Sequence, residues 1–308
     1  SRLRSLRTSL EAAGSEAAEG AVRSLLAVLD GSSPSPAVAP AEPFSSSTLS
    51  DLAGGLDDPQ LKALAVLWRS AHHLLRKDLA EIGVVRAVPQ SSSSPSPVAT
   101  SFDEATAVLG VETARLLHVP AGPVVRVVAS APPAVLAGPG SAAASPELRY
   151  RVARAVAMTR PELLLGCALS PADLAMTLRG VRAAFGKSLA RGSLDFAAAS
   201  LAQDLWTAVP REVQEELREL LEVASAVDAE GVRGMALAAA ARLGLVATGD
   251  VAAAVSVAVL DDPFLAGIDP TSEEGLARAV RRSDQVAAIV RLVIDPGYAE
   301  ISWRPAPQ

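Results

Sequence analysis

Apolar residues at helical spacing mark two helices near the start of the chain. They recur every three or four positions through residues 2–30 and again from Pro59 to Ile82, as on the buried face of an amphipathic helix. Two segments rich in Ser and Pro, residues 31–48 and 89–101, break this periodicity and are typical of linkers. We therefore expect N-terminal helices on flexible linkers.

After residue 101 the pattern changes to short apolar runs. A helix is predicted over Phe102–Leu109, because Ser101 is a suitable N-cap and Glu104 follows three residues later. The break at Pro120–Pro123 predicts a hairpin-like turn between two strands. Three short, Val-rich runs predict a small sheet, and they cover Thr113–Val119, Val124–Ala129 and Ala134–Ala137.

From Ser145 onward the pattern is helical. Ser145 and Ser170 are each followed by Pro, which is favoured in the first turn of a helix, so both predict a helix start. No repeat of fixed period occurs, which argues against a helical solenoid. The predicted helices are 145–159, 170–185, 196–208, 211–226, 230–243, 248–259 and 273–294, the last of which is one helix or two. The predicted fold class is α+β, predominantly α-helical, with a three-stranded sheet packed on a multi-helix core.

Composition narrows the kinds of partner. Half of the 308 residues are hydrophobic but only 3% are aromatic, so Ala, Val and Leu build the core and favour closely packed helices. The abundance of Ala and Arg over Lys is typical of a GC-rich bacterial genome. The net charge is −6 with the two signs interspersed, which argues against a nucleic-acid partner. No apolar run reaches the roughly 18 residues of a transmembrane segment, and we expect none.

A single cysteine, Cys167, excludes an intramolecular disulfide and favours a reducing, cytoplasmic location. Cys167 lies in an apolar run, which favours a small buried residue over a catalytic thiol. His72 and His73 are neighbours on a helix and point in different directions, and His118 lies in a predicted strand. These three histidines are therefore interpreted as surface or core residues. The Gly-rich segment 138–141 lacks the Lys of a phosphate-binding loop and is interpreted as a turn.

The order of predicted elements carries a family resemblance over residues 102–259. The residues that carry it are Ala107–Val111 at the entry to the sheet, Pro133–Gly138 in its last strand, Ser145–Tyr150 at the start of a long helix, Arg160–Pro161 at its end and Ala241–Gly244 at a later helix end. This order resembles the gluzincin metallopeptidases of the CAAX-prenyl-endopeptidase type. It is more closely similar to a degenerate version in the C-terminal part of large myxobacterial proteins, often beside tetratricopeptide repeats.

The resemblance implies where zinc ligands would lie. The family uses an H-E-x-x-H motif, in which two His one turn apart bind zinc and the Glu activates water. The resemblance places Arg154 and Met158 at the two His positions, Ala155 at the Glu and Leu237 at the third ligand, a Glu in the family. Arg stays protonated, Ala and Leu have no donor atom, and Met is too soft for zinc. We therefore expect no metal, no cofactor and no hydrolysis, and no H-E-x-x-H occurs elsewhere in the sequence.

These patterns divide the chain into six segments. They are an N-terminal helix at 1–30, a Ser/Pro-rich linker at 31–58, a second helix at 59–88, a Ser/Pro linker at 89–101, a degenerate zincin-like domain at 102–260 and a C-terminal helical extension with a coil tail at 261–308. The sequence does not begin with Met, so we expect a processed chain or part of a larger polypeptide or complex.

Three functions stay open at the level of sequence. The first is a pseudoenzyme that acts as a protein-interaction or scaffolding module, with protein partners. The alternative is a structural subunit of a homo- or hetero-oligomeric assembly, reached through the N-terminal helices and their linkers. The third is an unrecognised enzyme, for which Arg154, Asp173 and Asp250 are the candidate groups.

Overall fold

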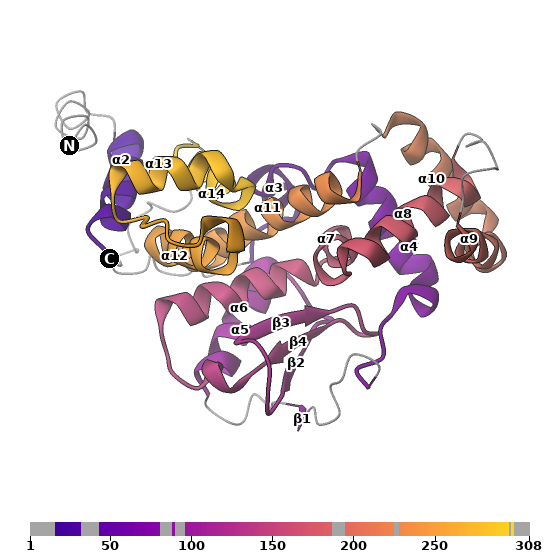
Figure 1. Cartoon of the computed structure of the whole chain (residues 1–308), viewed down its shortest axis with the longest axis horizontal. Helices are drawn as coiled ribbons and strands as arrows, with labels where there is room; N and C mark the ends of the chain where they lie inside the picture. The colour runs from indigo at the N-terminus through magenta and orange to yellow at the C-terminus, as the bar shows by residue number, and fades with distance from the viewer. Residues whose placement is uncertain are drawn as a thin grey trace.

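Helix α11 (Ala229–Thr248) runs through the middle of the molecule and organises its packing (Figure 1). It packs against α6 (Pro146–Met158), α7 (Pro161–Ala168) and α14 (Asp284–Val293). Small residues allow this, because Ala and Gly let neighbouring helix backbones approach closely. The computed structural model describes residues 16–31, 43–80, 88–89, 96–186, 195–224, 228–295 and 297–298.

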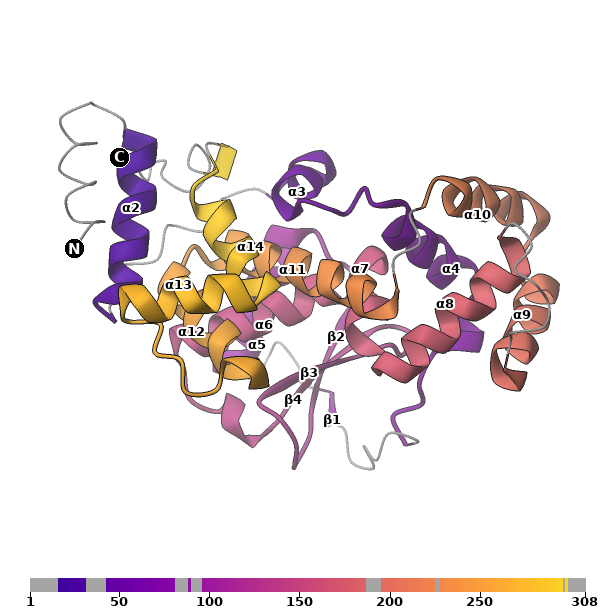
Figure 2. The same ribbon diagram turned by 45° about the horizontal axis from the view of Figure 1, so that its top comes forward.

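The remaining helices surround this centre. Helix α8 packs on α9, and these lie with α10 at the side of the molecule opposite α2 and α13 (Figures 1 and 2). Their bounds are α2 Glu16–Leu29, α3 Ser46–Ala53, α4 Pro59–Leu75, α5 Pro97–Leu109, α8 Pro171–Phe185, α9 Phe196–Ala208, α10 Arg211–Val223, α12 Val251–Asp261 and α13 Glu273–Arg282, with short 3-10 helices at Pro139–Ser141 (η1) and Pro263–Leu265 (η2).

Local capping explains where these helices begin. The hydroxyl of Ser145 accepts a hydrogen bond from the Leu148 amide at 3.1 Å, and Ser170 accepts from the Asp173 amide at the same distance. Each cap satisfies a backbone donor that the first helical turn leaves without a partner. Both predicted helix starts are therefore confirmed, and the predominantly helical α+β class is confirmed with them.

The sheet contains the three predicted strands, now β2 (Arg115–His118), β3 (Val125–Val128) and β4 (Ala134–Ala137). A two-residue strand, β1 (Val88–Pro89), pairs antiparallel with β2 at the edge. The order is β1-β2-β4-β3, with β4 parallel to β2 and antiparallel to β3. The predicted hairpin between β2 and β3 is wrong, because the fully buried β4 lies between them and pairs on both sides.

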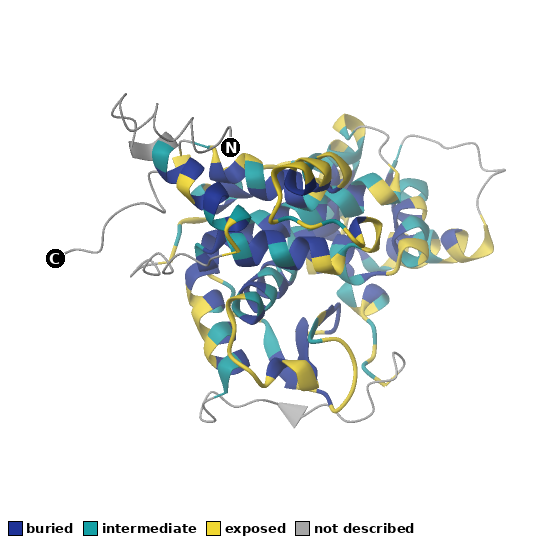
Figure 3. Ribbon diagram, turned by 60° about the vertical axis from the view of Figure 1, so that its left-hand side comes forward, coloured by how far each residue is buried: buried dark blue, intermediate teal, exposed yellow. Residues whose placement is uncertain are grey.

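Alternate residues of β4 face opposite sides of the sheet, as the two-residue period of a strand requires. Val135 and Ala137 join the main helical core, against which α6 packs. Ala134 and Leu136 belong to a smaller apolar cluster on the other face, against which Leu79 packs. Figure 3 shows many of the buried residues, in dark blue, on the central helices. The sheet thus forms one wall of the helical core.

Several predicted boundaries differ from the structure, and α4 ends at Leu75 where the periodicity predicts Ile82. Helix α5 begins at Pro97 with Ser96 as its N-cap, so Ser101 lies inside the helix and part of the expected 89–101 linker is helical. The expected 31–58 linker likewise contains α3, which Ser45 caps. In both cases a capping Ser stood inside a Ser-rich run, where composition hid it. Helix α11 continues past the predicted end at residue 243 to Thr248, and its C-cap is Gly249, whose φ of +68° suits the left-handed conformation.

The N-terminal helices pack on the rest of the molecule where they are described. Helix α2 contacts α12 and α14, and its Ala21, Leu25 and Val28 belong to the main core, while α4 contacts α7 and α10. The start of the predicted first helix, residues 1–15, and the connection at 32–42 lie outside the described residues. The two helices therefore contribute to the common core and are not separate modules in the described parts.

Among the described helices, α11 alone is long and apolar enough to cross a membrane by length and composition. Its most apolar window is 61% buried inside the fold. A helix surrounded by other protein helices needs apolar residues on all sides, so its hydropathy follows from its central position. We interpret α11 as the core helix of the fold.

Candidate functional site

Helices α6 and α11, which the family resemblance singled out, pack directly against each other. A Cβ atom added at Gly244 would lie 3.0 Å from Cα and Cβ of Arg154 and 3.1 Å from its amide nitrogen. One turn earlier on α6, the hydroxyl of Tyr150 donates a hydrogen bond to the carbonyl oxygen of Ala241 at 3.2 Å. Full burial raises the pKa of the Tyr150 phenol to about 12. At Gly244 the backbones of α11 and α6 are therefore in close contact, and we call this helix interface the α6–α11 seam.

The side chain of Arg154 leaves the seam toward other helices. It forms an ion pair with Asp261 at the end of α12, donates to Gln285 Oε1 of α14 at 3.3 Å and lies 5.8 Å from the ring centre of Tyr150. Arg151 also pairs with Asp261, so one carboxylate ties two turns of α6 to α12. These contacts give Arg154 a structural role at the position where the resemblance places a zinc-binding His.

The other three positions have different surroundings. Ala155 is buried in the core, and Met158 is half-buried and packs on it. Leu237 is half-buried on α11, seven residues before Gly244, which corresponds to about 10.5 Å of helix rise. The structure therefore does not bring Leu237 to the place where Arg154 meets α11. The residues at these four positions do not fit a zinc ion, since none is a His, Cys or carboxylate.

Titratable groups elsewhere in the described residues do not gather into a ligand set. No group of three or more His, Cys, Asp or Glu among them could hold a metal ion. His72 lies 5.7 Å from the Trp68 ring and 6.1 Å from the His73 ring, and His118 is exposed at the end of β2. The expected absence of zinc stays a prediction, which metal analysis tests.

The remaining candidate groups have structural partners. Asp250 is buried and caps α12 by accepting a hydrogen bond from the Ala253 amide at 2.9 Å. Asp173 lies 3.3 Å from the ammonium group of Lys77. Burial raises the pKa of the Cys167 thiol to about 12, so the thiol stays protonated near neutral pH and is a poor nucleophile.

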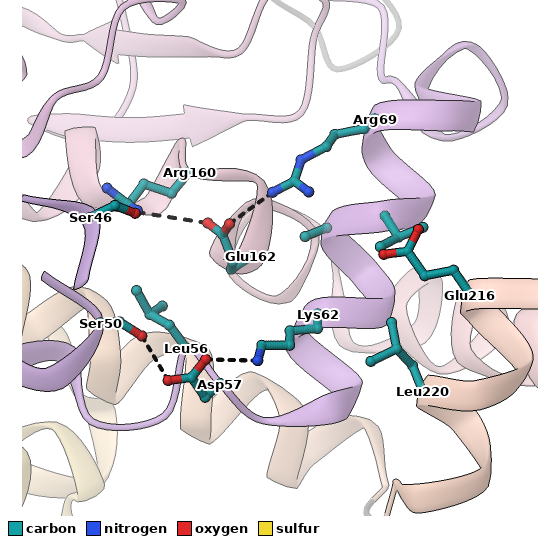
Figure 4. Close-up of a pocket in the computed structure, with 12 residues that line it drawn as sticks. Ser46, Ser50, Leu56, Asp57, Lys62, Arg69, Arg160, Glu162, Glu216 and Leu220 are labelled. Atoms are coloured by element: carbon teal, nitrogen blue, oxygen red, sulfur yellow. Dashed lines mark hydrogen bonds and ion pairs between the residues drawn. The ribbon is translucent and has the colours of Figure 1, made fainter. Parts of the chain in front are cut away.

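A pocket of about 280 Å³ lies where α3, α4, α10 and the start of α7 meet (Figure 4). Its polar lining carries three cationic and three acidic side chains and two hydroxyls, and four apolar side chains complete it. One face of α4 supplies residues at helical spacing, and the other helices close the remaining sides. The lining residues are Ser46, Ser50, Leu56, Asp57, Lys62, Ala65, Val66, Arg69, Arg160, Glu162, Glu216 and Leu220.

Glu162 is the centre of one wall of this pocket. It is the second residue of α7, held there by Pro161 at the first position, and its Oε1 lies 3.0 Å from Nη2 of Arg69. Its Oε2 lies 3.8 Å from Nε of Arg160, too far for a hydrogen bond. Among the described residues both of these buried atoms, Nε of Arg160 and Oε2 of Glu162, lack a hydrogen-bond partner. One carboxylate is thus shared unequally by two guanidinium groups.

Asp57 occupies the opposite wall. The turn between α3 and α4 ends at Asp58, which caps α4, and this turn places Asp57 beside the pocket. Asp57 accepts a hydrogen bond from Ser50 at 2.9 Å and pairs with Lys62 at 2.7 Å. These two donors, Lys62 first, lower the pKa of the Asp57 carboxyl, which favours its ionised form.

The pocket was not predicted from the sequence. Its residues come from four helices, and no two neighbouring positions form a recognisable motif. Lys62, Val66 and Arg69 share one face of α4, but this pattern is equally typical of a helix face exposed to solvent. Only tertiary packing brings α10 and α7 against it.

A second candidate surface lies on α9 and α10. Phe196 is 90% exposed, Val223 is 71% exposed and Trp206 is 48% exposed. Trp206 is held in place, because its ring stacks on Phe185 at 6.2 Å and Arg218 lies 5.3 Å from its ring centre. We call these three exposed residues the α9–α10 surface. Exposed large apolar side chains on neighbouring helices are typical of contact sites for other proteins.

Comparison with known proteins adds no relative: no family model, curated protein or solved structure matches this chain. The gluzincin resemblance therefore stays a prediction.

Proposed function

We propose that the chain is a non-catalytic protein-interaction module. The observation that carries this proposal is the α9–α10 surface, where Phe196 is the most exposed of the large apolar residues in the described part of the chain. The closed α6–α11 seam supports it, because the four positions of the resemblance hold no metal ligand or water-activating group. Helix α10, which carries Val223, is acidic overall, with five Glu against Arg211 and Arg218, so a partner with Lys or Arg around an apolar contact matches it.

Matched surface variants test this proposal. Phe196→Ser removes the most exposed aromatic ring of the α9–α10 surface, whereas Phe264→Ser removes an equally exposed ring, 84%, on η2. A partner crosslinked in extract of the source cells should be lost from Phe196→Ser and retained by Phe264→Ser. Equal capture by both variants and the wild type would contradict the proposal.

The second candidate function is a structural subunit of a larger assembly. Three other large apolar residues are exposed on the C-terminal part, namely Leu260 at 70%, Phe264 at 84% and Ile294 at 59%. A chain with two apolar surfaces on different sides can associate head to tail. Light scattering over a range of concentrations distinguishes the candidates, because self-assembly raises the mass and is weakened by Phe196→Ser and Phe264→Ser alike.

The absence of catalysis and a cytoplasmic location belong to the same proposal. A single cysteine whose thiol is held protonated by burial fits a reducing compartment. Zinc analysis of the purified protein tests the first part, and stoichiometric zinc would overturn it.

A further inference from the structure

The pocket between α3, α4, α7 and α10 separates its charges in space (Figure 4). Arg69 and Arg160 share the single carboxylate of Glu162, which leaves a net positive charge on that wall. Glu216 enters from α10 on another side and forms no ion pair with a described residue. The lining is neutral as a whole, with three cations and three carboxylates. However, the excess positive charge of the Arg69–Arg160 wall and the negative charge of Glu216 both face the inside of the pocket. A ligand that carries both charges meets both of them.

We propose that this pocket binds a small zwitterion of the α-amino-acid type, with its carboxylate at Arg69 and its ammonium group at Glu216. This inference is independent of the protein-interaction function, which rests on the α9–α10 surface. Burying a charge is costly unless it is paired, so a pocket with one excess of each sign selects against ligands that carry only one charge.

Size and apolar lining narrow the ligand further. Pockets for drug-sized ligands span roughly 300–1,000 Å³, and this pocket of about 280 Å³ falls below that range. Leu56, Val66 and Leu220 supply apolar atoms between the charged walls. A short aliphatic side chain matches this lining, whereas a large aromatic or a third charged group does not. The favoured ligand is a small aliphatic amino acid such as valine.

Arg69 can accept the carboxylate of a ligand at low cost. Its side chain is 59% exposed and its partner in the protein is Glu162. When a ligand takes over Arg69, Glu162 keeps a second cation in Arg160, whose Nε is 3.8 Å away and has no hydrogen-bond partner among the described residues. A small shift of Glu162 toward Arg160 would form the hydrogen bond that is now missing. The carboxylate of a ligand can therefore replace Glu162 at Arg69, and Glu162 still pairs with Arg160, so no charge is left unpaired.

Calorimetric titration of the full chain tests the proposal. L-valine should bind saturably, and N-acetyl-L-valine and L-valinamide, which each lack one charge, should bind about tenfold more weakly or worse. Arg69→Gln and Glu216→Gln should weaken L-valine binding to the same extent, while Arg69→Lys retains part of it. Glu219→Gln, also exposed on α10 but outside the pocket, is the matched control and should bind as the wild type does.

Three results would overturn the inference. The first is the absence of saturable binding of any proteinogenic amino acid at millimolar concentration. The second is equal binding of N-acetyl-L-valine, which would make the pocket a simple anion site. The third is unchanged affinity in Arg69→Gln, provided that circular dichroism shows the variant to be folded. Loss of partner capture in Phe196→Ser is unaffected by any of them, so this proposal and the interaction function fail separately.

Discussion

Replacing Gly244 by Ala should destabilise the protein, although Ala is the better helix former. Gly244 lies inside α11, four residues before its end, where a change from Gly to Ala is ordinarily worth about 1 kcal/mol of added stability. Here the new methyl group would lie 3.0 Å from two carbon atoms of Arg154 and 3.1 Å from its nitrogen. Two of these three atoms belong to the backbone of α6, which cannot turn aside as the end of a flexible side chain can.

The magnitude follows from these two opposing terms. Forcing an extra methyl group into a packed interface typically costs about 1–3 kcal/mol. The contact is tight along backbone atoms, and α6 is also tied to α12 by Asp261, so we expect the upper part of that range. Subtracting the gain in helix propensity leaves a net loss of about 1–2 kcal/mol. A lower free energy of unfolding in Gly244→Ala would show that α6 and α11 pack closely, because the change in helix propensity alone would raise it.

The same helix offers a matched control in Gly234. A Cβ added there would meet only Oδ2 of Asp284 at 3.5 Å, which is an ordinary contact. Gly234→Ala should therefore stabilise the protein by about 0.5–1 kcal/mol. Urea unfolding followed by circular dichroism measures both variants, and the midpoints should move in opposite directions at constant slope. A Gly244→Ala variant as stable as Gly234→Ala would refute the close approach of α6 and α11.

Three further predictions concern the buried groups and the family resemblance. The raised pKa of Tyr150 means that the folded state holds the phenol proton more tightly, so stability present below pH 10 is lost as the pH rises toward 12, by about 3 kcal/mol. Urea midpoints measured against pH should show this loss in the wild type and not in Tyr150→Phe. The thiol of Cys167 should react with Ellman's reagent at pH 8 about a thousandfold more slowly in the folded chain than in urea, because its raised pKa leaves little thiolate. A variant with Arg154→His and Met158→His should gain less than about threefold in zinc affinity when Leu237→Glu is added, since Leu237 lies two helix turns from the contact of Arg154 with α11. Competition with a chelating dye measures the zinc affinity. A gain of about a hundredfold would show that the three positions converge.

Local signals predicted the helices well. Ser145 and Ser170 were identified as helix starts because a cap and the following Pro act within one turn of helix, independently of the rest of the chain. The same signal at Ser96 was missed because it stood in a run of Ser and Pro, where composition favoured a linker. Gly244 was placed at a helix end for a related reason, since Gly commonly ends helices and the sequence does not record that α6 passes beside it.

Long-range packing decided what the sequence did not predict. The order of the strands depends on the burial of β4 on both faces, which a hairpin signal at Pro120–Pro123 cannot encode. The pocket likewise depends on α10 lying beside α4, so that Glu216 and Arg69 line one pocket although the two are far apart in the chain. The sequence therefore predicts features that depend on neighbouring residues, such as helix caps. It does not predict sites whose residues come together only in the tertiary structure.

The closeness of α11 to its neighbours bears on where a function can lie. A Cβ added at Gly166 of α7 would be 2.7 Å from the Cβ of Ala236, and the approach at Gly244 to Arg154 is similarly close. A peptidase cleft needs room for a metal, a water molecule and an extended substrate, and at these two described contacts the helices lie too close for any of them. Small residues on α7 and α11 thus allow close packing at these two contacts. Both candidate sites lie elsewhere, and α10 borders both of them, because Glu216 lines the pocket and Val223 belongs to the α9–α10 surface.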